Sequence, residues 1–210
     1  MNLMPRSVPA EVLDRSVQLR GSVIARALLR LMGWRLLFEG LPAKQGVVVL
    51  YPHTSNWDFL PGILAKWAMG FPATVWSKDS LFRLPLVGRW LRWVGIRPVV
   101  RGAKQGVVGQ MAAAMQEAKA RDEFMWLAVT PEGTRSLTTG WRMGFYHVAM
   151  QAQVPVGLAV LDFGRREVGF KSIWNLSGDV AADFAVFAQV LSTCRGCKHE
   201  LAAPVRPIEK

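Results

Sequence analysis

The chain has 210 residues, of which 51% are apolar and 20% are charged, and Lys plus Arg outnumber Asp plus Glu by 26 to 15. This length suits one domain with a full core, and the charged fraction excludes a bundle of lipid-spanning helices. The formal net charge of +11 favours anionic partners such as lipid head groups, phosphorylated substrates or nucleic acid, without choosing among them.

The N-terminal segment predicts an amphipathic helix from Glu11 to Phe38, because apolar residues recur at helical spacing with arginines on the opposite face. Charged residues interrupt it too often for a transmembrane span or a signal peptide. The helix therefore either packs on the body of the protein or lies in a bilayer interface. We expect residues 1–40 to form this segment and residues 41–210 to form the main domain. The apolar positions are Leu13, Val17, Ile24, Leu28 and Leu31, and the opposite face carries Arg15, Arg26 and Arg30.

Beyond residue 40, short apolar runs alternate with helical patterns. Several runs are rich in β-branched residues, which is typical of buried strands. This alternation predicts an α/β fold, with a mixed, largely parallel sheet and helices on its faces, preceded by the N-terminal amphipathic helix. The predicted strands are 46–51, 73–77, 97–101, 124–129 and 154–163, and the predicted helices are 59–69, 84–94, 105–121 and 142–152.

His53 and Asp58 lie in the stretch YPHTSNWDFLP, directly after the first predicted strand. A histidine there is either a packed structural residue or a general base. The carboxyl ends of strands are where α/β sheets bind ligands, and a tight turn would bring the carboxylate to the imidazole. A carboxylate on one ring nitrogen leaves the other free to take a proton from a substrate hydroxyl. The nucleophile would then belong to the substrate.

A second polar turn, VTPEGTRS at 129–136, follows another predicted strand. Arg135 with its neighbouring hydroxyls offers donors for a phosphate, but Glu132 and Arg135 could instead only pair with each other. A third segment, GIRPVVRG at 95–102, places Arg97 and Arg101 around a short apolar run, where they are either ordinary solvated charges or anion ligands. Lys78 in WSKDS is a further candidate for binding an anion.

Together these segments resemble the glycerolipid acyltransferase family. Its His-x4-Asp motif matches His53 to Asp58, and its Glu-Gly-Thr-Arg motif matches Glu132 to Arg135 letter for letter. Two further blocks of the family look like Gly95 to Arg101 and Val154 to Val160. The order and spacing agree over roughly residues 46–162. The chain departs from the family at two positions: Thr130 stands where an aromatic residue is frequent, and Gly157 where a second proline is frequent.

The resemblance implies that residues 41–210 form an acyltransferase catalytic domain, with His53 as the general base and Asp58 orienting it. Arg101 and Arg135 would hold the phosphate of the acceptor, and Glu132, Gly133 and Thr134 would shape that loop. The reaction it implies moves an acyl chain from acyl-CoA or an acyl carrier protein to the hydroxyl of a lysophospholipid. By family default the acceptor is 1-acylglycerol-3-phosphate (lysophosphatidic acid) and the product is phosphatidic acid, in phospholipid biosynthesis. A lyso-ornithine lipid is an alternative acceptor, and no cofactor or metal is implied.

The segment 81–95, LFRLPLVGRWLRWVG, interleaves arginines with aromatic residues, which suits a bilayer interface or single-stranded nucleic acid. A nucleic-acid partner is not expected, because it leaves His53, Asp58 and the Glu132–Arg135 turn unexplained. A non-catalytic membrane-binding module is another alternative.

Cys194 and Cys197 lack a second pair of zinc ligands, so we expect free thiols. The expected location is the cytoplasmic face of a membrane, peripheral or monotopic.

Overall fold

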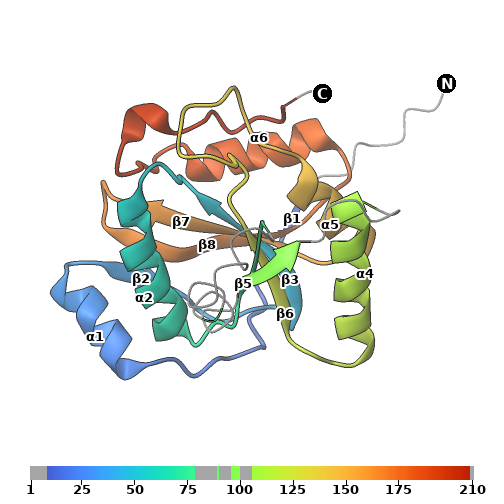
Figure 1. The fold of residues 1–210 in the computed structure, drawn as a ribbon, viewed down its shortest axis with the longest axis horizontal. Coiled ribbons are helices and arrows are strands. Elements are labelled where there is room, and N and C mark those ends of the chain that lie inside the picture. Colours follow the sequence, from blue (N-terminus) through green and yellow to red (C-terminus); the bar gives the residue numbers. More distant parts are fainter. Residues whose placement is uncertain (1–8, 79–88, 90–95, 100–105, 209–210) are drawn as a thin grey trace.

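The computed structural model describes residues 9–78, 89, 96–99 and 106–208. Its strands form one mixed sheet in the order β1-β8-β7-β3-β6-β4-β5, and β2 also pairs with β8 (Figure 1). The strands from β7 to β5 in this order run parallel, whereas β8 is antiparallel to β7. The bounds are β1 (Ala10–Glu11), β2 (Arg35–Leu37), β3 (Gln45–Tyr51), β4 (Thr74–Lys78), β5 (Ile96–Val99), β6 (Met125–Val129), β7 (Val156–Asp162) and β8 (Glu167–Asn175).

Helices cover both faces of this sheet, which confirms the predicted α/β fold class. In Figure 1, α1 and α2 lie on one face, and α4, α5 and α6 lie on the other. The side chains of β3 alternate between the two layers: Val47 and Val49 pack on the α4–α6 side, and Val48 packs on the α1–α2 side. The helices are α1 (Val23–Leu31), α2 (Phe59–Met69), α4 (Gly106–Ala120), α5 (Gly144–Ala152) and α6 (Val180–Leu191), with 3-10 turns at η1 (Asn56–Asp58) and η3 (His199–Leu201).

The predicted helix from Glu11 to Phe38 is wrong over most of its length, because only α1 is helical. Before α1, the chain at Gly21 lies so close to the end of α2 that a Cβ there would be 2.0 Å from the carbonyl oxygen of Ala68. After α1, Gly33 adopts a φ of +75°, a left-handed conformation that ends the helix. Residues on either side join the sheet instead, β1 and β2 both pairing with β8.

The apolar face predicted for this helix does not cover the core. Leu29 is buried against the sheet, together with Ala25. Ile24 and Leu31, two positions of the predicted apolar face, are 74% and 85% exposed. Successive residues of a helix are rotated by about 100°, so Ile24 and Leu31 fall on one side of α1, next to the side that buries Ala25 and Leu29. The exposed apolar side of α1 therefore faces solvent rather than the core. Within the described residues, no helix has the length and apolar content needed to cross a bilayer.

The five predicted strands all have counterparts, in β3 to β7, and α2, α4 and α5 match three predicted helices. The prediction for 84–94 lies outside the described residues except for Arg89. Both β8 and α6 were missed. The apolar run of β8 is broken by Gly169, Lys171 and Ser172. By contrast, α6 has a recognisable N-cap residue, Asp179, whose side chain accepts hydrogen bonds from two backbone N–H groups of the first turn.

Packing explains why Gly157 departs from the family pattern. It lies in β7 between β3 and β8, where a Cβ would be 2.5 Å from the ring of Phe170. That ring packs edge-on against Trp126, with centroids 5.7 Å apart. A proline at this position would also lack the N–H that a central strand uses in its ladder.

Candidate active site

The polar motifs converge at one edge of the sheet because their strands are parallel neighbours. β3 pairs with β6 in register from Gln45 opposite Met125 to Val49 opposite Val129. The chain leaves β3 at Tyr51 and reaches His53 two residues later, and it leaves β6 at Val129 and reaches Glu132 three residues later. The His-x4-Asp and Glu-Gly-Thr-Arg segments therefore lie side by side at the carboxyl edge, where open α/β sheets bind ligands.

The turn after β3 brings His53 and Asp58 together, as expected. Asp58 is the third residue of η1, and it forms a capping box with Ser55. Its Oδ2 accepts backbone N–H bonds from Thr54 at 2.8 Å and Ser55 at 2.9 Å, and it lies 3.1 Å from His53 Nδ1. This distance is that of an ion pair, although the ring is not aligned for a regular hydrogen bond. The imidazole is 19% exposed, whereas the carboxylate of Asp58 is 1% exposed.

Glu132 holds the two loops together from within the protein. Its Oε2 accepts the backbone N–H of His53 at 2.7 Å, and its Oε1 accepts the backbone N–H of Ala203 at 3.0 Å. The residue is 1% exposed. Burial raises the pKa of this carboxyl, and the two N–H bonds act in the opposite direction. The sequence left open a pairing of Glu132 with Arg135. Among the described residues, the Glu132 carboxylate binds the two backbone N–H groups instead.

The rest of that turn faces solvent. Gly133 adopts a φ of +69°, a left-handed conformation that favours glycine, and the side chain of Arg142 lies over it. Thr134 Oγ1 accepts the N–H of Ser136 at 3.3 Å. Arg135 is exposed, and among the described residues its guanidinium has no hydrogen bond or ion pair. No sequence pattern pointed to Arg142, an exposed arginine two residues before α5 whose side chain covers Gly133.

Two predicted anion ligands cannot be placed as side chains. Lys78 is the last residue of β4, at the same edge of the sheet, but only its backbone is described. Arg101 lies outside the described residues, two positions beyond the end of β5. Cys194 and Cys197 are free cysteines, and burial raises the pKa of the Cys194 thiol.

Residues near the C-terminus also contact the site, and no sequence pattern pointed to them. The segment after α6 returns along the carboxyl edge, where the N–H of Lys198 donates to Thr54 Oγ1 at 3.1 Å. Ala203 donates its N–H to Glu132 and accepts the hydroxyl of Tyr51 at 3.0 Å. Burial and the charge of Glu132 raise the pKa of Tyr51 to about 12. In Figure 1 this segment passes above the sheet near the start of α2.

His53 lies next to the buried carboxylate of Asp58 at the carboxyl edge of the sheet. This arrangement is typical of enzymes in which a histidine takes a proton from a hydroxyl. The model of the Acyltransferase family matches residues 37–157, more than half of the chain, and this span includes both motifs. The chain therefore belongs to the Acyltransferase family. It is therefore an acyltransferase.

A solved structure similar to this chain is "Crystal Structure of the 1-acyl-sn-glycerophosphate (LPA) acyltransferase, PlsC, from Thermotoga maritima". The two sequences are 16% identical, with a TM-score of 0.48. The similarity covers 81% of this chain and 73% of that one. A comparison with curated proteins gives no significant match.

Proposed function

We propose that the protein transfers an acyl chain from a thioester of coenzyme A or acyl carrier protein to the free hydroxyl of a lysophospholipid. The proposed acceptor is 1-acylglycerol-3-phosphate, and the product is then phosphatidic acid. The observation that carries the proposal is the approach of Asp58 Oδ2 to His53 Nδ1 at 3.1 Å, in a turn fixed by Glu132. No cofactor takes part in this reaction.

In the proposed mechanism, Asp58 holds the proton of His53 on Nδ1, so Nε2 accepts the proton of the acceptor hydroxyl. The hydroxyl oxygen attacks the thioester carbonyl and forms the new ester bond. The tetrahedral intermediate then expels the thiolate, which takes the proton from Nε2. Asp58 stabilises the imidazolium that exists between these two proton transfers. The acyl chain passes directly from sulfur to oxygen, without an acyl-enzyme.

Arg135 is proposed to bind the phosphate of the acceptor. Its guanidinium is exposed in the turn that starts at Glu132, and Glu132 links that turn to His53. A guanidinium binds a phosphate through two parallel hydrogen bonds, which fixes the orientation of the acceptor as well as its position. Arg101 and Lys78 are proposed as further ligands, because Lys78 ends β4 and the sequence reaches Arg101 two residues after β5, the parallel neighbour of β4.

The protein is also proposed to associate peripherally with the cytoplasmic face of a membrane, through the N-terminal residues 1–40. Four apolar residues of α1 are exposed, and such a face gains free energy when it enters the apolar boundary of a bilayer. The net charge of +11 adds attraction to anionic lipid. The four residues are Val23, Ile24, Leu28 and Leu31.

The proposed reaction is tested by incubating the purified chain with one labelled acyl thioester and a panel of lysolipids, followed by thin-layer separation of the products. We expect labelled phosphatidic acid from lysophosphatidic acid, and acyl-CoA and acyl carrier protein are compared as donors. Replacing His53 with Ala removes the base, so the rate is expected to fall by about 10²-fold or more. Near-full activity of His53→Ala would refute this mechanism, and a labelled lyso-ornithine product alone would change the acceptor.

A further inference from the structure

The residues that follow α6 lie beyond the span matched by the family model, yet they contact both catalytic turns. We propose that the segment Cys194–Ala203 is a positioning element that sets the geometry of the His53–Asp58 pair. This inference rests on the proposed role of His53 as the base. It assigns the segment a part in the chemical step, through backbone groups that touch the catalytic turn.

A continuous chain of contacts leads from this segment to the base. The N–H of Lys198 donates to Thr54 Oγ1 at 3.1 Å. The N–H of the same threonine donates to Asp58 Oδ2 at 2.8 Å, and Oδ2 lies 3.1 Å from His53 Nδ1. A displacement of Thr54 therefore moves the carboxylate relative to the imidazole. Thr54 is 2% exposed, so water has little room to replace Lys198 as its partner.

Close packing at Gly196 reinforces this chain. A Cβ at Gly196 would lie 2.6 Å from Thr54 Oγ1 and 3.2 Å from Cβ of Pro52. The atoms that it would meet belong to short, branched or ring side chains next to His53, so they have little freedom to move away. The segment therefore touches the residues on both sides of the base.

The segment is itself fixed to a rigid part of the sheet. The N–H of Phe163, just after β7, donates to the carbonyl of Arg195 at 2.8 Å. The buried Asp162 accepts the N–H of Arg195 at 3.3 Å. At the other end, Ala203 connects Glu132 with Tyr51 at the end of β3. The segment thus spans the carboxyl ends of β7, β3 and β6, and it passes over the catalytic turn between them.

Two pairs of variants of the full chain test the inference. Thr54→Val removes the acceptor oxygen but keeps the shape, whereas Thr54→Ser keeps the oxygen. Gly196→Ala pushes on the catalytic turn, whereas Gly144→Ala is a matched control, because a Cβ at Gly144 has no neighbour within 4 Å. Steady-state kcat and KM are measured for donor and acceptor, with rates expressed per folded protein from thermal unfolding curves. His53→Ala is assayed in the same series.

A displaced base lowers the rate of the chemical step, so Thr54→Val and Gly196→Ala should lower kcat by about 10-fold to 10²-fold with little change in KM. Thr54→Ser and Gly144→Ala should remain close to the parent. The inference is overturned if Thr54→Val keeps full kcat, if Thr54→Ser is impaired as much as Thr54→Val, or if the loss disappears once rates refer to folded protein. An active His53→Ala would instead refute the proposed function, whereas an inactive His53→Ala with a normal Thr54→Val would refute this inference alone.

Discussion

Glu132 Oε2 accepts the backbone N–H of His53 at 2.7 Å, so the turn after β6 holds the turn after β3. The carboxylate of Glu132 therefore binds the backbone of His53, whereas the carboxylate of Asp58 lies against its imidazole ring. In the Glu-Gly-Thr-Arg motif, the first residue, Glu132, is thus buried and links the two turns, whereas the last residue, Arg135, is exposed. Two adjacent strands therefore provide the proposed base and the proposed phosphate-binding turn as one unit.

Asp58→Asn is expected to reduce kcat by at least about 10²-fold, the usual contribution of a positioned acid–base group. One oxygen, Oδ2, accepts the N–H groups of Thr54 and Ser55 and lies against His53 Nδ1. The asparagine amide would therefore either place its NH2 against all three groups, or keep an oxygen there and bury its NH2 at the Oδ1 position, without the negative charge that stabilises the imidazolium. Asp122→Asn is the matched control, since Asp122 is an exposed partner of Lys44 at the opposite edge of the sheet. Equal activities of the two variants would exclude the assigned role of Asp58.

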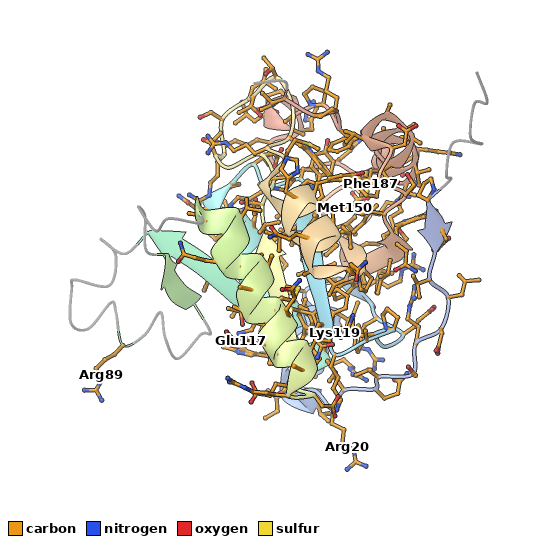
Figure 2. All side chains as sticks on the ribbon, turned by 90° about the vertical axis from the view of Figure 1, so that its right-hand side faces the viewer. Arg20, Arg89, Glu117, Lys119, Met150 and Phe187 are labelled. Atoms are coloured by element: carbon orange, nitrogen blue, oxygen red, sulfur yellow. The ribbon has the colours of Figure 1, made fainter. Side chains whose placement is uncertain are left out.

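Arg135→Lys is expected to raise the KM of the phosphorylated acceptor while leaving kcat nearly unchanged, because lysine keeps the charge but loses the two-pronged geometry. Arg121→Lys is the control: Arg121 follows α4 and pairs with Glu117, which lies toward the lower end of that helix in Figure 2. Initial rates are measured with lysophosphatidic acid and with an acceptor that lacks phosphate. An equal rise in KM for both acceptors would contradict phosphate binding by Arg135.

Glu132→Gln should destabilise the fold by about 1–3 kcal/mol, because an amide cannot accept both N–H groups and one buried donor loses its partner. Burial raises the pKa of Glu132 in the folded state. Its contribution to stability is therefore greatest below its unfolded pKa and falls as the pH rises through the folded pKa. Glutamine does not titrate, so its contribution does not change with pH. The difference in the free energy of unfolding between the parent and Glu132→Gln should therefore narrow from acidic to neutral pH. Urea unfolding over that range measures the gap, and a widening gap would contradict the raised pKa.

Replacing Ile24 and Leu31 with Glu should weaken binding to anionic vesicles without unfolding the protein, because both side chains are largely exposed. Deleting residues 1–38 is a poorer test, since it removes two strands of the sheet together with α1. Met150→Glu is the control, from α5 on the opposite face of the sheet (Figure 2). Vesicle sedimentation of the Ile24 and Leu31 variants at the parent level would rule α1 out as the anchor.

Local sequence was sufficient to predict the central part of the fold. Buried parallel strands such as β3 are continuous apolar runs, and α2 follows from its spacing. The edge strands β1 and β2 are only two and three residues long, and they exist because β8 is there to pair with them. No local pattern reveals such a strand. The N-terminal helix was overextended because helical spacing continues through segments where tertiary contacts at Gly21 and Gly33 decide the backbone.

The approach of Asp58 to His53 was predictable for a similar reason, because the two residues are close in sequence and separated by turn-forming residues. The partners of Glu132 were not predictable. Its bonds go to backbone N–H groups 79 and 71 residues away, and any residue except proline supplies such a donor. The sequence also left Glu132–Arg135 pairing open, and only the three-dimensional contacts decide against it.

The bonds that complete the catalytic edge have a consequence for the order of folding. Tyr51 and Ala203 are 152 residues apart in the sequence, and Thr54 and Lys198 are 144 residues apart. Contacts of such long range form late, because the entropy of closing the loop has to be overcome first. During synthesis, the catalytic turn leaves the ribosome long before the residues that fix it. A nascent chain that has already formed β3, β6 and β7 would therefore still lack the contacts that fix the turn of His53, which can form only after residues 198 and 203 have been synthesised.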